Sequence, residues 1–283
     1  MKRCSVCKTT YDDNFEYCPK CGRRIYPFDE ETKLVINNGV LSSIIPSSYT
    51  KRPPYWYYLD YYLIDNGFKK EEWQEKATLN IPSSVYKIQL EKHYICNEGI
   101  FYDVNFPNSI REVDLKDCYF FHECRIINNI KMPTGWKKLG HAFYCSALEN
   151  ILSIPCGTEE LAPGFLFKSS VGKIELPSSL KRIECHAIYD THIKEMIVPS
   201  SITYWALGTY GSGFERDHNR VDNLVYKGSR FQLRNVFERT LRELPEVWKN
   251  KDIHVNEEQI IHCSDGDVRL KSTGKYSFTA ENV

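Results

Sequence analysis

Four cysteines near the amino terminus have the residue type and spacing needed to bind a metal ion: Cys4, Cys7, Cys18 and Cys21. They form two C-x2-C pairs that are separated by ten residues. Each pair can direct two sulfurs at one ion from a tight turn, and two such turns complete a tetrahedron of thiolates around zinc. Because four thiolates leave no position for water or substrate, the pattern predicts a structural zinc site.

The segment around these cysteines has too few apolar side chains to fold by burial alone. Ordering costs about 1.5 kcal/mol per residue, whereas structural zinc contributes about 10 to 16 kcal/mol in finger peptides. Cys18-Pro-Lys-Cys-Gly-Arg-Arg24 resembles the second half of the short zinc ribbons found at the amino termini of many bacterial proteins. The resemblance implies a zinc ribbon over residues 1–26, but no activity. A redox-active dithiol is the alternative, and two pairs at this separation favour zinc.

The charge of the chain argues against a role that depends on a strong electrostatic field. Lys plus Arg and Asp plus Glu each number 37, so we do not expect binding to nucleic acid or to an anionic membrane. The most hydrophobic run, residues 55–64, contains Asp60 and is shorter than the roughly 20 residues of a membrane span. The amino terminus lacks the apolar stretch of a secretory signal. We therefore expect a soluble, cytoplasmic protein with reduced cysteines.

Six prolines mark an internal repeat. They are separated by 25, 26, 22, 22 and 22 residues, and hydrophobic residues recur one position before, three after and six after each of them, with Thr158 as the exception. The prolines are Pro82, Pro107, Pro133, Pro155, Pro177 and Pro199. Segments such as Lys173 to Pro177 predict short strands that end at proline, and the polar pairs that follow four of the prolines turn the chain. Each unit can bury its apolar columns only against its neighbours, so the pattern predicts a solenoid.

The repeat resembles the BspA-type leucine-rich repeat. His141-Ala-Phe-Tyr-Cys145, Leu180-Lys-Arg-Ile183 and Ala187-Ile188 carry the likeness, which covers residues 79 to 228. The resemblance implies a mainly β fold with short helices, a leucine-rich-repeat-like solenoid over 81–228, and a bacterial source. We divide the rest of the chain into the ribbon at 1–26, a linker and amino-terminal cap with short helices at 27–80, and a carboxyl-terminal cap at 229–283.

The flanking regions carry further expectations. A helix is predicted to begin near Pro54, and the aromatic segment 55–64 is either a cap or a ligand platform. Pro46 is interpreted as a seventh, degenerate unit, and residues 259–268 as a terminal strand of the array. Apolar residues from Phe231 to Leu244 predict an amphipathic cap helix whose arginines are paired with nearby glutamates.

The sequence contains no P-loop, no nucleophile elbow and no dinucleotide fingerprint. Cys118, His122 and Cys124 are not expected to form a second metal site. Cysteines in the middle of successive units are interpreted as small buried core residues instead, namely Cys96, Cys118, Cys145 and Cys185. His262 and Cys263 are expected to point to opposite faces of a strand. The predicted function is a non-enzymatic protein-protein interaction scaffold. The alternatives are a nucleic-acid-associated zinc-ribbon protein and a cell-surface adhesion protein of the BspA type; the partner and the oligomeric state stay open.

Overall fold

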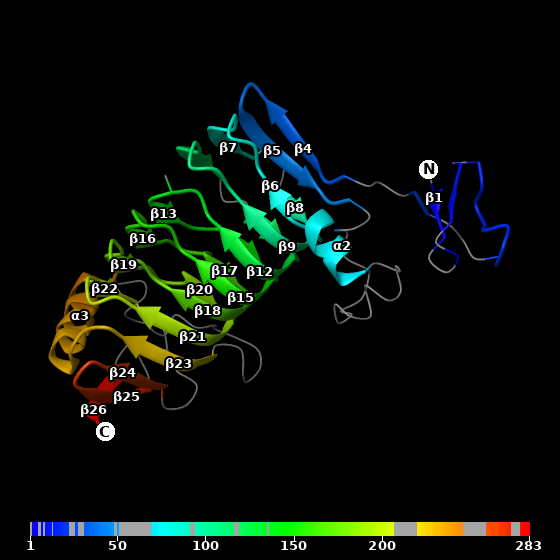
Figure 1. Ribbon diagram of the computed structural model, residues 1–283. Coiled ribbons are helices and arrows are strands. Elements are labelled where there is room, and N and C mark those ends of the chain that lie inside the picture. The colour runs from blue at the N-terminus through cyan, green and yellow to red at the C-terminus, as the bar shows by residue number, and fades with distance from the viewer. Residues whose placement is uncertain are drawn as a thin grey trace.

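The protein is a β-solenoid preceded by a small cysteine-containing unit. The computed structural model describes residues 2–4, 7, 9–12, 14–22, 26–27, 31–47, 50, 69–90, 94–115, 119–134, 136–206, 220–245, 259–272 and 278–283. Figure 1 shows short strands stacked in successive coils, from cyan through green to yellow, with helix α3 and the carboxyl terminus at the far end. The expected fold class, mainly β with short helices and a leucine-rich-repeat-like solenoid, is confirmed.

The longest sheet contains one strand from each unit. Its first seven strands are β6 (Leu79–Asn80), β9 (Ile100–Asn105), β12 (Arg125–Lys131), β15 (Ala147–Ser153), β18 (Ser170–Glu175), β21 (His192–Val198) and β23 (Arg220–Tyr226). They pair in parallel in that order. Parallel neighbours require a crossover between them, and the rest of each unit provides it.

Two further columns of strands form the other sides of each coil. One column contains β8 (Tyr94–Asn97), β11 (Tyr119–His122), β14 (Phe143–Tyr144), β17 (Leu166–Phe167) and β20 (Ile188–Tyr189). The other begins with β7 (Lys87–Gln89) and β10 (Glu112–Asp114), which pair with each other, and continues in later units as a separate four-stranded sheet of β13 (Lys138–Leu139), β16 (Glu160–Leu161), β19 (Arg182–Ile183) and β22 (Tyr204–Trp205). The hairpin of β4 (Lys33–Asn37) and β5 (Val40–Ile45) joins both columns, because β5 pairs with β7 and with β8.

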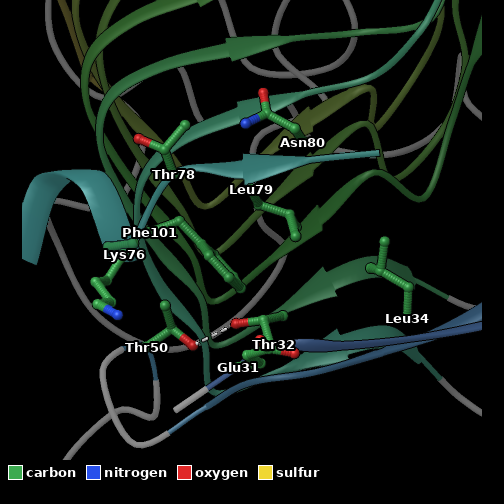
Figure 2. A pocket seen from close by; sticks show the side chains of 10 residues that line it. Glu31, Thr32, Leu34, Thr50, Lys76, Thr78, Leu79, Asn80 and Phe101 are labelled. Atoms are coloured by element: carbon green, nitrogen blue, oxygen red, sulfur yellow. Dashed lines mark hydrogen bonds between the residues drawn. The ribbon is translucent and has the colours of Figure 1, made fainter. Parts of the chain in front are cut away.

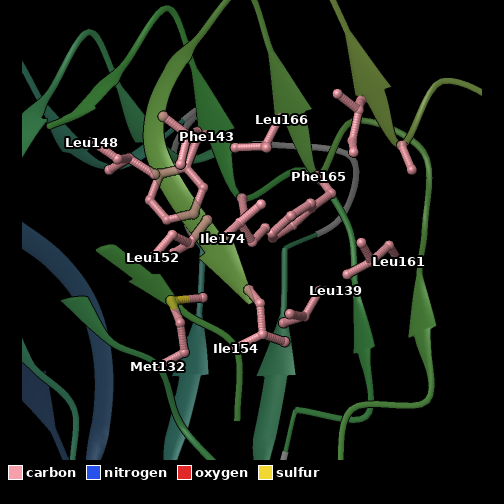
Figure 3. Packing of buried hydrophobic residues seen from close by; sticks show 14 of the residues in the cluster. Met132, Leu139, Phe143, Leu148, Leu152, Ile154, Leu161, Phe165, Leu166 and Ile174 are labelled. Atoms are coloured by element: carbon pink, nitrogen blue, oxygen red, sulfur yellow. The ribbon is translucent and has the colours of Figure 1, made fainter. Parts of the chain in front are cut away.

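The repeated apolar positions meet in one continuous core. Every residue of the three proline-anchored columns is buried except Val113, which is partly buried against the same core. Thr158 is also buried, and its hydroxyl donates to the carbonyl of Trp136 at 3.2 Å. The one polar residue of the three columns therefore has a hydrogen-bond partner inside the core. Figure 3 shows side chains from several units, including Met132 and Phe143, packed together inside the coil.

The turn after each proline is held in the same way in all six units. The proline carbonyl accepts a hydrogen bond from the amide three residues later, as in Val85 to Pro82 at 3.0 Å. The second polar residue after proline also links neighbouring units: the Ser179 hydroxyl donates to the carbonyl of Thr158 at 2.7 Å, and that of Ser201 to Leu180 at 2.9 Å. The polar pairs therefore join the units in addition to turning the chain.

A second corner contains a ladder of buried hydroxyls. The amide of Cys124 donates to Ser146 Oγ at 3.2 Å, the amide of Ser146 to Ser169 Oγ at 3.2 Å, and the amide of Ser169 to Thr191 Oγ1 at 3.4 Å. Just before each of these residues, the chain adopts a left-handed conformation; at Cys145 φ is +50°. Cys145 is half-buried at this corner, so our interpretation of it as a buried core residue is wrong, whereas it holds for Cys96 and Cys185.

Helices lie near both ends of the solenoid. At the amino-terminal end, α2 (Lys70–Lys76) buries Trp73 completely, with its ring 6.3 Å from that of Tyr102 in β9. At the other end, α3 (Arg230–Glu243) begins with a capping box of Ser229 and Gln232. Its buried residues include Leu233, whereas Phe231, which we expected on the apolar face, is 72% exposed. The amphipathic cap helix is confirmed with this correction.

Three other expectations concern the regions before and after the repeats: Pro46, the terminal strand at 259–268, and the segment from Pro54 to residue 64. Pro46 follows β5, which pairs with β7 and β8 and not with β6, so Pro46 does not begin a seventh unit of the longest sheet. β24 (Gln259–Cys263) does extend that sheet next to β23, but the chain reverses at residues 264–265 into β25 (Gly266–Ser272), which pairs antiparallel, as does β26 (Phe278–Asn282). The expected helix near Pro54 and the aromatic segment 55–64 lie outside the described residues.

Gly172 in β18 is required by a bulge in the neighbouring strand, and this generates the first prediction. A Cβ atom at this position would lie 2.3 Å from the carbonyl oxygen of Glu149 and 2.5 Å from that of Asn150. We expect Gly172→Ala to lower the free energy of unfolding by about 3 kcal/mol, because backbone atoms must move. Ser170→Ala, at an exposed position of the same strand, should change it by less than about 0.5 kcal/mol. Urea denaturation measures both, and equal midpoints would contradict the clash.

The packing of α3 on the last unit generates a second prediction. Thr240 Oγ1 accepts from the buried amide of Trp205 at 2.9 Å and donates to the Val236 carbonyl at 2.8 Å. Thr240→Val removes the acceptor at similar volume, and we expect a loss of about 1 to 3 kcal/mol because the amide is left unsatisfied. Thr240→Ser keeps the hydroxyl and should lose less. Thermal denaturation of the two variants tests this order, and a Thr240→Val protein as stable as Thr240→Ser would refute it.

Candidate metal centre

The four cysteines of the amino terminus are carried by a small antiparallel sheet. Its strands are β1 (Lys2–Arg3), β2 (Thr10–Tyr11) and β3 (Tyr26–Pro27), with β1 in the middle. Cys4 follows β1, and its amide donates to the carbonyl of Thr9 at 3.1 Å, which closes the first turn. The amide of Gly22 donates to the carbonyl of Cys18 at 2.8 Å, and Gly22 has φ +69°, a conformation that glycine adopts without strain.

The sulfurs of Cys4, Cys7, Cys18 and Cys21 all lie within 4.8 Å of one another. The sulfurs of Cys4 and Cys21 lie 3.5 Å apart. A tetrahedral zinc ion with Zn–S bonds of about 2.3 Å holds its sulfurs about 3.8 Å apart, so the spacing fits a metal ion among them. Cys4 and Cys18 are buried, whereas Cys21 is exposed. The structure therefore brings together all four residues that the sequence singled out, in a group that could hold a metal.

The surroundings of the cluster favour ionised sulfur at Cys18. Burial alone would raise the pKa of this thiol, but hydrogen bonds from the Tyr11 hydroxyl and from the amides of Lys20 and Cys21 outweigh it and lower the pKa to about 6. The Tyr11 hydroxyl lies 3.3 Å from Cys18 Sγ, and the amide of Cys7 donates to Cys4 Sγ at 3.3 Å. The contact of Tyr11 was not predicted, because nothing in the spacing of the cysteines indicates which aromatic ring lies beside them.

The other cysteines and histidines that were considered for chemistry do not form a second centre within the described part of the chain, where the only group of three or more potential ligands is the ribbon set. Cys118 lies outside the described residues, and Cys124 is buried with its sulfur near the carbonyl of His122 at 3.3 Å. His262 is exposed and pairs with Asp267 at 3.0 Å, whereas Cys263 packs against the core. They lie on opposite faces of β24, as expected.

The arginines of α3 are engaged with neighbouring groups. Arg239 pairs with Glu243 at 2.6 Å, and Glu243 also accepts from Arg182 of β19 at 3.1 Å. Arg230 lies 3.7 Å from the carboxylate of Asp265, and Arg234 donates to Asn282 at 2.8 Å. Hydrogen bonds from Arg239 and Arg182 lower the pKa of Glu243. The expected pairing with a glutamate of the helix is confirmed for Arg239, whereas Arg230 and Arg234 contact residues near the carboxyl terminus and Arg242 donates to the backbone carbonyl of Glu238.

A pocket of about 370 Å³ lies between the amino-terminal hairpin and the first strands of the longest sheet. Figure 2 shows its lining, where Thr32 and Thr50 share a hydrogen bond of 2.9 Å and Phe101 contributes an apolar surface. Glu31 and Lys76 are the ionisable residues among those that line it. Among its described lining residues there is no histidine, no cysteine and no pair of carboxylates.

The coiled parallel strands, the proline-anchored columns and the capped ends define a leucine-rich-repeat solenoid. The model of the BspA type Leucine rich repeat region (6 copies) matches residues 65–155 and 89–211, which together span more than half of the chain. The chain therefore belongs to the BspA-type leucine-rich repeat family. No curated protein and no solved structure matches the chain. Neither of the helices in the described residues is long and apolar enough to cross a membrane.

The cysteine cluster generates a third prediction. We expect the purified full chain to contain about one equivalent of a thiophilic divalent metal, and the Cys7→Ser, Cys18→Ser double variant to lose it, because two oxygen ligands replace thiolates. Cys156→Ser, which changes an exposed cysteine of the solenoid, is the matched control and should retain the metal. Elemental analysis by mass spectrometry measures content and identity together. A double variant with full metal content would show that the ion is bound elsewhere.

Proposed function

We propose that this protein is a non-enzymatic scaffold whose solenoid presents its outer surface to a protein partner. The observation that carries the proposal is a single core of buried residues that extends from Leu41 to Leu270. The side chains that point outward from each unit are not part of this core, so its packing does not depend on them. Stacked units make an extended face, and such faces suit macromolecules better than small substrates. Membership of the BspA-type family supports the same role.

In this proposal, the four cysteines hold a structural zinc ion. Cys4, Cys7, Cys18 and Cys21 would supply four thiolates, so zinc would be fully coordinated by protein and would stabilise the fold without taking part in a reaction. We assign the ribbon to residues 1–26, the linker and amino-terminal cap to 27–80, the solenoid to 81–228 and the carboxyl-terminal cap to 229–283. Because zinc thiolates require reduced cysteines, the proposal places the protein in a bacterial cytoplasm.

Crosslinking in the native cell tests the scaffold role. We expect a lysine-reactive crosslinker to join a protein partner to exposed lysines of the solenoid, namely Lys131, Lys168 or Lys194. The Cys7→Ser, Cys18→Ser double variant is the control and should retain these crosslinks, because the ribbon is not the docking surface. The proposal fails if no protein is crosslinked while the purified chain converts a small molecule.

The two alternative functions make different predictions. A nucleic-acid-associated ribbon requires an affinity that falls steeply with salt, because phosphate contacts release counterions; absent or salt-independent binding eliminates it. A surface adhesion protein requires recovery of the chain from the cell envelope, whereas the scaffold proposal expects a metal-loaded protein with reduced thiols in the cytosolic fraction. Fractionation followed by thiol titration decides between the two locations.

A further inference from the structure

A ladder of aromatic side chains lies on the outer face of the column that contains β8, β11, β14, β17 and β20. His122 of β11, Tyr144 of β14, Phe167 of β17 and Tyr189 of β20 occupy equivalent registers in neighbouring strands, and Tyr94 of β8 stacks on His122. We call these five residues the aromatic strip. Each is only partly buried, because its strand neighbour, for example Phe143, points into the core instead. The strip therefore forms a continuous, partly exposed surface along the stack.

The rings of the strip stack face to face. The centroid of His122 lies 4.0 Å from that of Tyr94 and 5.0 Å from that of Tyr144, and the next two steps, to Phe167 and then to Tyr189, are 5.0 and 4.8 Å. All four interplanar angles are 22° or less. These steps follow the strand spacing of about 4.8 Å. The faces of the inner rings are covered by their neighbours, so an incoming ligand meets ring edges.

Covered ring faces argue against two common ligands of aromatic surfaces. A nucleobase binds by stacking on an exposed aromatic face, and a sugar ring packs on such a face in the same way. The ring edges instead present an apolar ridge that carries the hydroxyl groups of Tyr94, Tyr144 and Tyr189 at intervals. Such a surface suits a partner that combines apolar groups with carbonyl oxygens that accept hydrogen bonds.

One of the two borders of the strip carries more carboxylates than ammonium groups. The left-handed corner beside it carries Glu98, Glu123, Lys168 and Asp190, which together contain three carboxylates and one ammonium group. The ammonium of Lys168 lies 5.8 Å from the centroid of the Phe167 ring, so it is held next to the strip. The net negative charge of this border favours a cationic partner.

We propose that the aromatic strip binds an extended, proline-rich and positively charged segment of the partner protein. This proposal rests on the proposed scaffold function and names the chemistry of its partner. A polyproline II segment has no internal hydrogen bonds, so its carbonyls can accept from tyrosine hydroxyls, and its proline rings would pack against the apolar ring edges of the strip and not on the covered faces. With a rise of about 3.1 Å per residue, about six residues of such a segment would follow the five rings.

The test uses the full chain and a labelled peptide of four proline-proline-arginine repeats. Fluorescence anisotropy should show saturable binding that weakens by about ten-fold or more in the Tyr144→Ala, Tyr189→Ala double variant. The Tyr144→Phe, Tyr189→Phe variant keeps the rings and should lose about three-fold or more, because it removes only hydroxyl donors. Phe231→Ala, which changes an exposed ring on α3, is the matched control and should bind like the wild type.

Other outcomes overturn the proposal. It fails if the wild type does not bind the peptide, if a glutamate-containing counterpart binds equally well, or if Phe231→Ala weakens binding as much as the strip variants. Binding of oligothymidine or a cello-oligosaccharide that the strip variants abolish would assign the strip to nucleic acid or sugar. If the strip variants retain the crosslinked partner of the wild type, the scaffold function stands and the strip proposal falls.

Discussion

No single unit of this solenoid can shield its own apolar side chains from water. Each unit of 22 to 26 residues contributes a thin layer of apolar side chains, and that layer becomes a core only when units lie against it on both sides. The burial of large side chains such as Phe121 and Phe143 contributes about 25 cal/mol per Å² of apolar surface. Stacking is therefore a condition of folding, and the end units need cover from α2, the β4–β5 hairpin and α3.

Polar contacts turn this stacking into a defined register. Serine and threonine hydroxyls at two corners bond to the backbone of the adjacent unit, as in Ser169 with Ser146 and Ser179 with Thr158. These bonds satisfy backbone groups that would otherwise be buried without partners. Because the register is fixed, a residue type that recurs at one outward position becomes a continuous ladder. His122, Tyr144, Phe167 and Tyr189 form the strip in this way, and Tyr94, which lies outside this register, extends it by stacking on His122.

The amino-terminal unit obeys a different constraint. Among the described residues of this unit, the buried cluster consists of Cys4 and Cys18, with Cys7 and Tyr11 packed against them, which is a very small core for an independent fold. Four sulfurs within 4.8 Å of one another form a group that could hold a metal ion. The chain thus combines a solenoid stabilised by repeated packing with a small unit whose buried groups are mainly cysteines.

The sequence by itself determined the features that depend on local spacing. The columns around each proline and the four cysteines were predictable because a fixed number of residues separates the groups that must converge. Four other features were decided only by the tertiary structure: the Tyr11 hydroxyl beside Cys18, the pairing of β5 that excludes Pro46 from the repeat, the exposure of Phe231, and the stacking of Tyr94 on His122. The first two units are longer than the others, so the alignment of outward side chains depends on where each strand begins. That alignment is set by packing across units, which no local pattern encodes.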